Sequence, residues 1–537
     1  MATPSLAMIP SAYADSKVYS VLPNNGDGDF TFNRDSSATR VGQNGLIQTV
    51  GFFGNELVTN GSFDTDTDWS KGTGWTISGG KASQSGGVGQ LSQTIGISTG
   101  VACRIEITVT VTAGTIRISP GPSGIGANFS VSGTYSFNDS FVGNSILYIL
   151  GTSSSFVGSI SNISIKEVTG DQPRLNYDIS NGVVQSCPSL LLEGASTNVF
   201  NYSEQASNNS IVNSLTVTDN FAISPDGKQT AFQVNCLAGT FRRIRQIYSV
   251  SAGSAYAMSF FVKKSLTPVS TYTGMGMVWQ GGTQKVNYII VDEFNGTLTV
   301  LQDQTLNLTT KVEDSGQYWR FSVAATDTGS NTSFEAAFYG CLSNNGSSIG
   351  GGAKIWIGWG IQVEALSYPT SYIPTNGSSQ TRAAESCNDA GNASTFNSTE
   401  GVLYLEIATL SDDLTNRAIS VSDGSSSNKV QLKFDNSSNQ IEYDVSKNGV
   451  SQVGIDRVIT DTTNYNKIAC KWKANDFTLW VNGVEIGDDT IGSTPIGLSD
   501  LSFDDGNGNS DFYGKCKDIR VYNEALTDAQ LITLTTL

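Results

Sequence analysis

Histidine is absent from the 537 residues of this sequence, and only 15% of the residues are charged. Without an imidazole, a Ser-His-Asp triad, a Cys-His pair and a zinc site with histidine ligands are all excluded. Long apolar runs are missing too, since none reaches the ~18 residues that a membrane-spanning helix needs. No basic stretch followed by an apolar one begins the chain. We therefore expect neither a membrane anchor nor a secretory signal peptide.

Cysteine is scarce and irregularly placed. The seven cysteines lie far apart, their number is odd, and no CxxC motif occurs. Such spacing favours free thiols in a chain made in a reducing cytosol, several of them packed as small apolar residues. One bridge stays open as an alternative, between Cys470 and Cys516 on two predicted strands.

Positive charge is in deficit, and the formal net charge is −17. A protein this acidic repels the phosphates of nucleic acids and of anionic lipids. We therefore expect neither nucleic acid nor membrane as a partner. The charge instead suits the solubility of a large, exposed protein.

What the sequence does contain is glycine, 57 residues of it, with Ser, Thr and Asn between short apolar runs. Polar side chains alternate with Ile and Val over residues 104–111, and residues 355–364 also follow a period of two. This period indicates half-buried β-strands. The sequence therefore predicts an all-β protein built from tandem antiparallel β-sandwich (jelly-roll) modules.

At about 150 residues per domain, the length predicts three or four domains. The first 54 residues are too few for an independent core, so this N-terminal segment is expected to dock either on a module of its own chain or on another protein. The predicted units are the N-terminal docking segment (1–54), a first jelly-roll module (55–170), a connector (171–197), a second jelly-roll module (198–367), a second connector (368–397) and a C-terminal sandwich (398–537).

Two local signals stand out in the C-terminal sandwich. Asn482 and Gly483 both tolerate positive φ, and they predict a tight hairpin turn between FTLWV and VEIG. Thr527 and Gln530 have capping-box spacing, which predicts the start of a short terminal helix.

The C-terminal sandwich contains GVLYLEI, WKANDFTLWVNG and FYGKCKDIRVYNEALTDAQL. In these stretches it resembles concanavalin A-like, laminin-G-like lectin sandwiches, which implies two stacked antiparallel sheets. The two earlier modules look like jelly-roll carbohydrate-binding families in LVTNGSFDTDTDWSKGTGW and VSAGSAYAMSFFVK.

Three linking phrases carry a second resemblance: GDFTFNRDSSATRVGQNGLIQ, SLLLEGASTNVFNYSE and YPTSYIPTNGSSQTRAAE. They are similar to stretches of tailed-bacteriophage structural proteins, among them tail-fibre, head-fibre and decoration proteins. The resemblance implies a virion component whose partners are other virion proteins, reached through the N-terminal segment, and glycans of the host surface. It also implies a homo-oligomer, although no heptad run supports a trimer.

Sugar binding by such folds needs exposed aromatic rings flanked by polar side chains, because the C–H faces of a pyranose stack on the ring. Trp69, in TDTDWSKG, and Trp279, in MVWQGG, are the candidate carbohydrate-binding residues. The alternative for both is that the ring only packs within its own module.

The loop DDGNGNSD is the candidate metal site. Asp505, Asn507, Asn509 and Asp511 follow the alternate spacing of the first ligands in a calcium-binding loop. The pattern then departs from that loop, since Ser510 stands where glycine is expected and Cys516 where glutamate is expected. Calcium is the predicted ion, and a solvated acidic turn is the alternative.

Paired carboxylates for glycoside hydrolysis have no signature in this sequence. Most Asp and Glu residues fall in turns, where turn geometry alone explains them, and the C-terminal sandwich has no ExDxE-like strand. We therefore expect a non-enzymatic virion surface protein that displays glycan-binding modules. A polysaccharide depolymerase and a purely structural decoration protein remain the alternatives.

Overall fold

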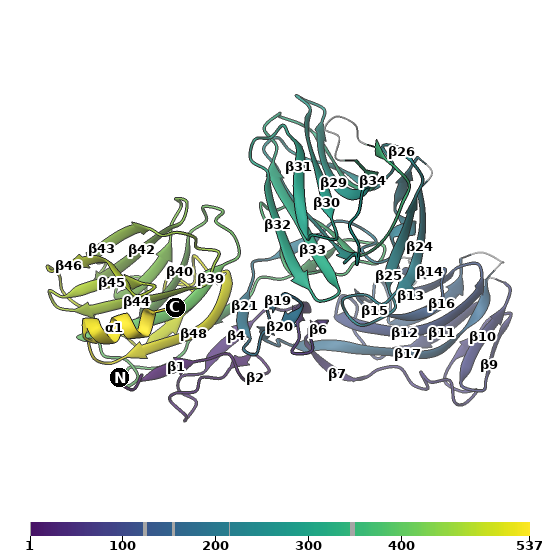
Figure 1. Cartoon of the computed structure of the whole chain (residues 1–537). Helices are drawn as coiled ribbons and strands as arrows, with labels where there is room; N and C mark the ends of the chain where they lie inside the picture. Colours follow the sequence, from purple (N-terminus) through teal and green to yellow (C-terminus); the bar gives the residue numbers. More distant parts are fainter. Residues whose placement is uncertain (1, 88, 122–125, 153–155, 214, 344–349) are drawn as a thin grey trace.

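The structure is a computed structural model that describes residues 2–87, 89–121, 126–152, 156–213, 215–343 and 350–537. Over these residues the regular secondary structure is almost entirely β-strand, with a single α-helix, α1 (Asp528–Thr535), near the C-terminus. The predicted all-β fold is confirmed. Three β-sandwiches form three lobes, and both ends of the chain lie at the C-terminal one (Figure 1). In the part of the chain described, no helix combines the length and the apolar character needed to cross a membrane.

The first module packs two antiparallel sheets on one core. Alternate residues of its long central strands point inward, so Ile105 and Ile163 are buried while their polar neighbours face outward. One sheet has the order β15 (Gly133–Ser140), β12 (Ala102–Ala113), β17 (Val157–Gly170), β10 (Lys81–Ser85), β9 (Trp75–Ser78), with β7 (Phe52–Glu56) also on β17. The other has the order β14 (Ala127–Phe129), β13 (Ile116–Pro120), β16 (Ile146–Gly151), β11 (Gln90–Thr94), β8 (Ser70–Lys71).

The second module is a larger sandwich of the same kind, with an aromatic core. Its first sheet is β23 (Ser210–Val212), β27 (Arg243–Ser249), β34 (Ser333–Leu342), β29 (Tyr272–Gln280), β30 (Lys285–Asp292), β31 (Thr297–Asp303). Its second is β24 (Leu215–Ala222), β25 (Ala231–Cys236), β36 (Lys354–Glu364), β28 (Ala255–Lys263), β33 (Tyr318–Thr326), β32 (Thr309–Ser315). A 3-10 turn, η1 (Ala206–Asn208), and the short pair β26 (Gly239–Thr240) and β35 (Gly350–Gly351) complete it.

The C-terminal sandwich draws strands from three distant parts of the chain. One sheet is β18 (Arg174–Asn176), β21 (Ser189–Leu192), β48 (Gly514–Tyr522), β39 (Glu400–Thr409), β44 (Asn466–Lys473), β45 (Phe477–Val481), β46 (Val484–Asp489), with β1 (Leu6–Met8) also on β48. The facing sheet is β43 (Val450–Val458), β42 (Gln440–Lys447), β41 (Lys429–Phe434), β40 (Arg417–Ser422), β47 (Asp500–Ser502).

The N-terminal segment docks on a module of its own chain, which is one of the two alternatives left open by the sequence. Strand β1 pairs with β48, so that Leu6 lies opposite Val521, and the apolar side chains of Met8, Phe30 and Phe32 are buried in the core of the C-terminal sandwich. These side chains are therefore not free to dock on another protein. The predicted connector over 171–197 likewise contributes β18 and β21 to the C-terminal sheet.

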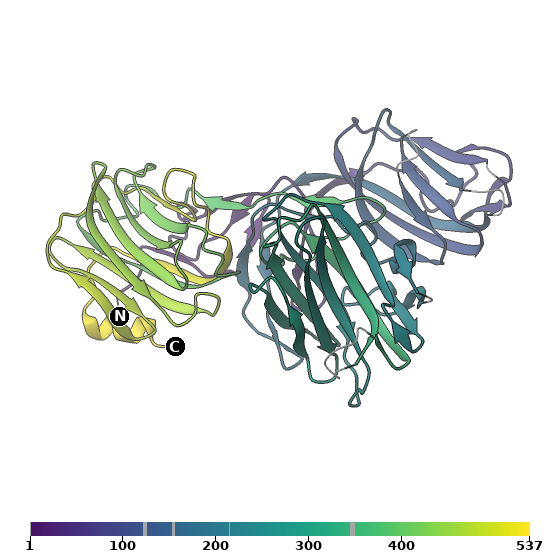
Figure 2. The same cartoon turned by 90° about the horizontal axis from the view of Figure 1, so that it is seen from above.

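Short strand pairs tie the connecting segments together between the lobes (Figure 1; Figure 2). They are β2 (Tyr13–Ala14), β3 (Lys17–Val18), β4 (Phe30–Asn33) and β38 (Ser386–Asn388) in one small sheet, and the pairs β5 (Ala38–Val41) with β6 (Ile47–Val50), β19 (Ile179–Ser180) with β20 (Val183–Val184), and β22 (Ser196–Asn198) with β37 (Gln380–Arg382).

A buried cluster of five charged side chains, which we call the hub, joins these segments: Arg34, Arg174, Glu193, Arg382 and Glu385. Glu385 accepts hydrogen bonds from Arg34 Nη1 at 2.9 Å and from Arg174 Nε at 2.8 Å. Glu193 lies 2.7 Å from Nη1 of both Arg174 and Arg382. Burial alone would raise the pKa of Glu193, but Arg382 and Arg174 outweigh it and hold that pKa well below its usual range.

The hub also brings together the three linking phrases singled out in the sequence. Arg34 lies in the first phrase, Glu193 in the second, and Arg382 and Glu385 in the third. Phrases separated by more than a hundred residues thus form one structural unit between the sandwiches.

Two further predictions are confirmed, and one alternative is wrong. The hairpin at Asn482-Gly483 and the capping box of α1 are both present. All seven cysteines are free, so the alternative bridge between Cys470 and Cys516 is wrong. These two cysteines lie on β44 and β48, which are on opposite sides of β39, so strand β39 separates them.

Candidate functional site

A cavity of about 330 Å³ lies where the first module, the β5–β6 hairpin and the second module meet. We call it the inter-module cavity. Segments from residue 39 to residue 374 contribute to its lining. Its volume is at the lower end of the range of small-molecule sites, about 300–1,000 Å³.

The first module supplies a polar wall from the outer face of β12 and β17. Arg104 and Glu106 on β12 lie directly opposite Lys166 and Ser164 on β17, and all four side chains line the cavity. Because side chains alternate along a strand, the isoleucines between them point into the core instead. The alternation was visible in the sequence, but it did not reveal which surface the polar face would meet.

The second module supplies the opposite wall. Glu204 accepts a hydrogen bond from the Tyr372 hydroxyl at 2.8 Å. Asp226 accepts from the Ser224 hydroxyl and from the backbone amide of Lys228, so its carboxylate is held in a turn. With Arg104, Lys166 and Lys228 facing Glu106, Glu204 and Asp226, acids and bases balance around the cavity.

The aromatic floor of the cavity is rigid. Trp359 donates its indole N–H to Thr230 Oγ1 at 2.9 Å, and its ring packs against Tyr372 with centroids 4.4 Å apart. Both rings are almost completely buried. They therefore form a packed floor, and neither ring exposes a face on which a sugar could stack.

Two groups in the cavity are electrostatically unusual. Burial lowers the pKa of Arg104, although the neighbouring carboxylates counter part of this effect, and Arg104 Nη1 is buried with no hydrogen-bond partner. Burial raises the pKa of Glu204 to about 7, and the charge of Asp226 adds to the shift. A buried donor without a partner costs roughly 1–3 kcal/mol, which an accepting ligand would recover.

Phe53, on β7, is the exposed ring at this cavity, with 38% of its surface accessible. The sequence did not predict Phe53 as a sugar-stacking ring, because only Trp69 and Trp279 stand among polar turn residues of the kind that flank such rings. The one available signal was the pair Phe52-Phe53 beside two glycines, Gly51 and Gly54, in a polar neighbourhood.

The two tryptophans predicted to bind carbohydrate lack the exposure that the prediction required. Trp69 is 7% exposed, packs against Phe63 and donates its indole N–H to the Asn60 carbonyl. Trp279 is fully buried and packs against Phe334 within the core of the second module. Both rings pack within their own modules, which is the alternative stated for them.

The predicted calcium loop closes largely on itself. Asp505 Oδ1 accepts the backbone amides of Asn507 and Asn509, at 2.9 and 3.1 Å, and Asp511 accepts the Tyr513 hydroxyl. These hydrogen bonds account for an acidic turn that holds no ion. They do not direct the carboxylates of Asp505 and Asp511 toward one shared ligand position. Calcium binding at this loop therefore stays a prediction.

The calcium prediction has a direct test. A site of the extracellular-module type has a Kd of about 0.1–1 mM, so calcium at ten times Kd should stabilise the protein by about 1.4 kcal/mol. Differential scanning calorimetry with calcium and with chelator measures this shift. Asp511→Asn should abolish it, whereas Asp435→Asn, at a different acidic cluster, should not; no heat in a calcium titration would rule out the site.

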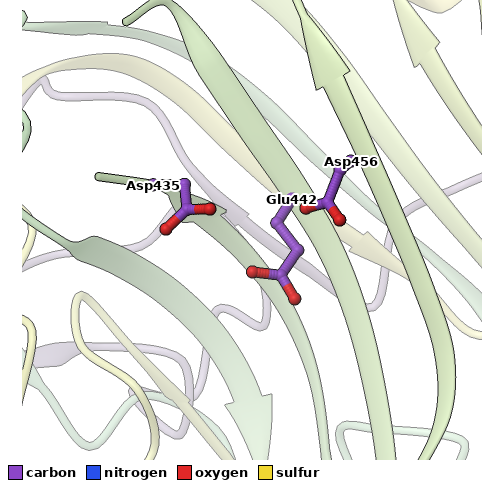
Figure 3. Close-up of side chains that lie close together, drawn as sticks. All are labelled: Asp435, Glu442 and Asp456. Atoms are coloured by element: carbon purple, nitrogen blue, oxygen red, sulfur yellow. The ribbon is translucent and has the colours of Figure 1, made fainter. Parts of the chain in front are cut away.

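That other cluster consists of Asp435, Glu442 and Asp456, whose carboxylate oxygens lie within 4.8 Å of one another (Figure 3). Glu442 lies opposite Asp456 on the neighbouring strand and opposite Lys433 on the other side. Lys433 Nζ pairs with Glu442 and lies 3.6 Å from Asp435. The lysine ammonium thus already pairs with two of the three carboxylates, and an ion would have to compete with it.

The protein consists of β-sandwiches arranged in series along the chain. A polar cavity with an exposed aromatic ring at its edge lies between two of them. Residues 391–532 match the concanavalin A-like lectin/glucanases superfamily (Laminin_G_3). The C-terminal sandwich is therefore concanavalin A-like, as its sequence resemblance predicted. No match is found among curated proteins.

Solved structures with similar parts include proteins that act on or bind carbohydrate. The leech intramolecular trans-sialidase is 20% identical over 26% of this chain and 24% of its own, with a TM-score of 0.23. The CBM40 module of the Ruminococcus gnavus IT-sialidase is 16% identical over 27% of this chain and 87% of its own (0.24). The tandem CBM22 domains of Paenibacillus barcinonensis Xyn10C are 12% identical over 58% and 98% (0.21). At such scores, only the geometry of the site bears on what it binds.

Proposed function

We propose that this protein is a non-enzymatic glycan-binding protein of a virus particle surface, of the tail-fibre, head-fibre or decoration type, and that the inter-module cavity holds one neutral sugar unit. The observation that carries the proposal is the polar wall of the cavity, which includes Arg104, a residue whose Nη1 has no hydrogen-bond partner. A sugar hydroxyl oxygen can accept a hydrogen bond from a guanidinium group of this kind.

A neutral sugar suits the cavity better than a charged one. Basic and acidic side chains alternate around the lining, so an anion or a cation would meet like charges as well as opposite ones. Each hydroxyl of a sugar both donates and accepts, and can therefore bridge Arg104 or Lys166 to Glu106 or Glu204. The exposed ring of Phe53 provides an apolar face for the C–H side of the pyranose.

The particle origin is supported by the three linking phrases, which resemble phage structural proteins and which meet in the hub. A unit that keeps three distant phrases in contact holds the sandwiches in a fixed arrangement, which suits an adhesin on a particle. Repetition of the protein on that particle would turn weak binding at a single cavity into strong attachment.

The test is glycan binding by the full chain, first on an array of neutral and charged saccharides and then by calorimetry with the best ligand. Phe53→Ala should weaken binding about two- to tenfold, since ring contacts of this kind contribute roughly 0.5–1.5 kcal/mol. Phe294→Ala is the matched control, because Phe294 is 37% exposed and lies away from the cavity. Equal affinity in both variants, or no saccharide bound at all, would contradict the proposal.

Glycoside hydrolysis is the second candidate, and one observation favours it: Glu204 has its pKa raised to about 7 beside Asp226. A glycosidase needs such an acid next to a second carboxylate. Here, however, Tyr372 binds the carboxylate of Glu204 and a turn binds that of Asp226. Release of reducing ends from host polysaccharide, lost in Glu204→Gln, would establish the enzyme instead; a purely structural decoration protein would bind no glycan.

A further inference from the structure

Two thiols in the second module lie close together across its core. Cys236 is on β25 and Cys341 is on β34, and these strands belong to opposite sheets of the sandwich. The sulfurs of both cysteines lie 3.4 Å from the same acceptor, the carbonyl oxygen of Leu237. The two thiols also lie close enough for each to shift the pKa of the other. Both thiols are reduced and buried.

A glycine explains why the two sheets come so near at this point. A Cβ at Gly340 would lie 2.9 Å from both Cβ and Sγ of Cys236, which is closer than a side chain allows. The backbone of β34 can therefore approach β25 only because position 340 has no side chain. This close approach brings β34, the strand that carries Cys341, against Cys236 on the opposite sheet.

We propose that Cys236 and Cys341 are a modification site, at which a small two-electron oxidant of the peroxide class converts the two thiols to an inter-sheet disulfide. The proposal is independent of glycan binding. It concerns what happens to the second module when a protein made in a reducing compartment meets an oxidising one.

Cys341 is the thiol that reacts first. The neighbouring Cys236 thiol lowers the pKa of the Cys341 thiol, and the nearby Arg242 and Lys354 contribute to the shift. The thiolate is the nucleophile, so the lowered pKa favours reaction at Cys341. The neighbouring Cys341 and burial raise the pKa of the Cys236 thiol, so Cys236 keeps its proton.

The reaction balances with hydrogen peroxide alone. The Cys341 thiolate attacks one peroxide oxygen, the O–O bond breaks, and hydroxide leaves and takes up a proton to form water. The sulfur of Cys236 then attacks the sulfenic acid, the S–O bond breaks, and a second water leaves with the thiol proton of Cys236. Two thiols are oxidised to one disulfide and one peroxide is reduced to two waters.

The experiment compares the full chain before and after treatment with hydrogen peroxide. Peptide mapping without reductant should find Cys236 joined to Cys341, with a loss of two hydrogens. The bridge encloses about 100 residues, so the melting temperature of the second module should rise by roughly 5–10 °C and fall back with reductant. Oxidised glutathione, which is too large to reach buried sulfurs, should act far more slowly.

Variants separate this site from the other cysteines. Cys341→Ala should abolish both the linked peptide and the rise in melting temperature, whereas Cys103→Ala, which removes a buried thiol of the first module, should change neither. Mapping of the unmutated protein decides the matter even if Cys341→Ala fails to fold. Peroxide-treated protein in which both cysteines can still be alkylated after unfolding, or are oxidised separately without a link, would overturn the proposal.

Discussion

Replacing Glu385 by alanine should destabilise the protein by about 3–5 kcal/mol, which is the usual cost of removing one partner of a buried ion pair. Glu385 is fully buried and accepts from the guanidinium groups of Arg34 and Arg174 and from the backbone amide of Glu193. Without it, two buried arginines lose their main counter-charge. Denaturant unfolding, followed by intrinsic fluorescence, measures the loss.

The hub joins strands from three distant segments, so its failure should also loosen the lobes from one another. Limited proteolysis of Glu385→Ala should cut within the connectors 171–197 and 368–397 before it cuts the sandwiches. The control is Asp66→Ala, which removes one partner of the exposed pair with Lys71 and should cost less than about 1 kcal/mol. A loss for Glu385→Ala as small as that of the control would mean that water solvates the hub.

Alternation along the chain predicted the sandwiches because it is a local property. A strand such as β12 shows its two faces in consecutive residues, and a turn such as Asn482-Gly483 shows its geometry in two. The pairing of β1 with β48 has no local signature. It joins residues at opposite ends of the chain. The apolar sequence from Leu6 to Met8 would suit any apolar environment, so it does not indicate which strand it pairs with. The N-terminal segment could therefore be recognised as dependent, but its partner could not be predicted.

The cavity escaped prediction for a related reason. Its polar wall, Arg104 and Glu106, was visible as the outer face of a strand, but Glu204 and Tyr372 reach it from a different module and a connector. Trp69 lies within a polar turn, which predicts an exposed ring, but its ring turns inward and packs against Phe63. Exposure depends on the direction of a side chain in the folded module, which composition does not report.

Stability should rise as the pH falls from 8 to 5, and Glu204 should account for much of the change. Its pKa in the folded protein is raised from 4.5 to about 7, so between these pH values the folded state holds a proton that the unfolded state has lost. The stabilisation is complete below about pH 4.5 and is lost as the pH rises through 7. A shift of this size corresponds to about 3–4 kcal/mol.

Glu204→Gln should remove this dependence and make the protein more stable at pH 8, because glutamine still accepts the Tyr372 hydroxyl but carries no charge next to Asp226. Asp139→Asn is the matched control: burial raises the pKa of Asp139 to about 6 as well, but Asp139 lies in β15 and does not line the cavity. Denaturant titrations across the pH range measure the difference between each variant and the unmutated protein. If the Glu204→Gln curve runs parallel to that of the unmutated protein, Glu204 is ionised in the folded protein at pH 7, and Arg104 and Lys228 compensate its charge.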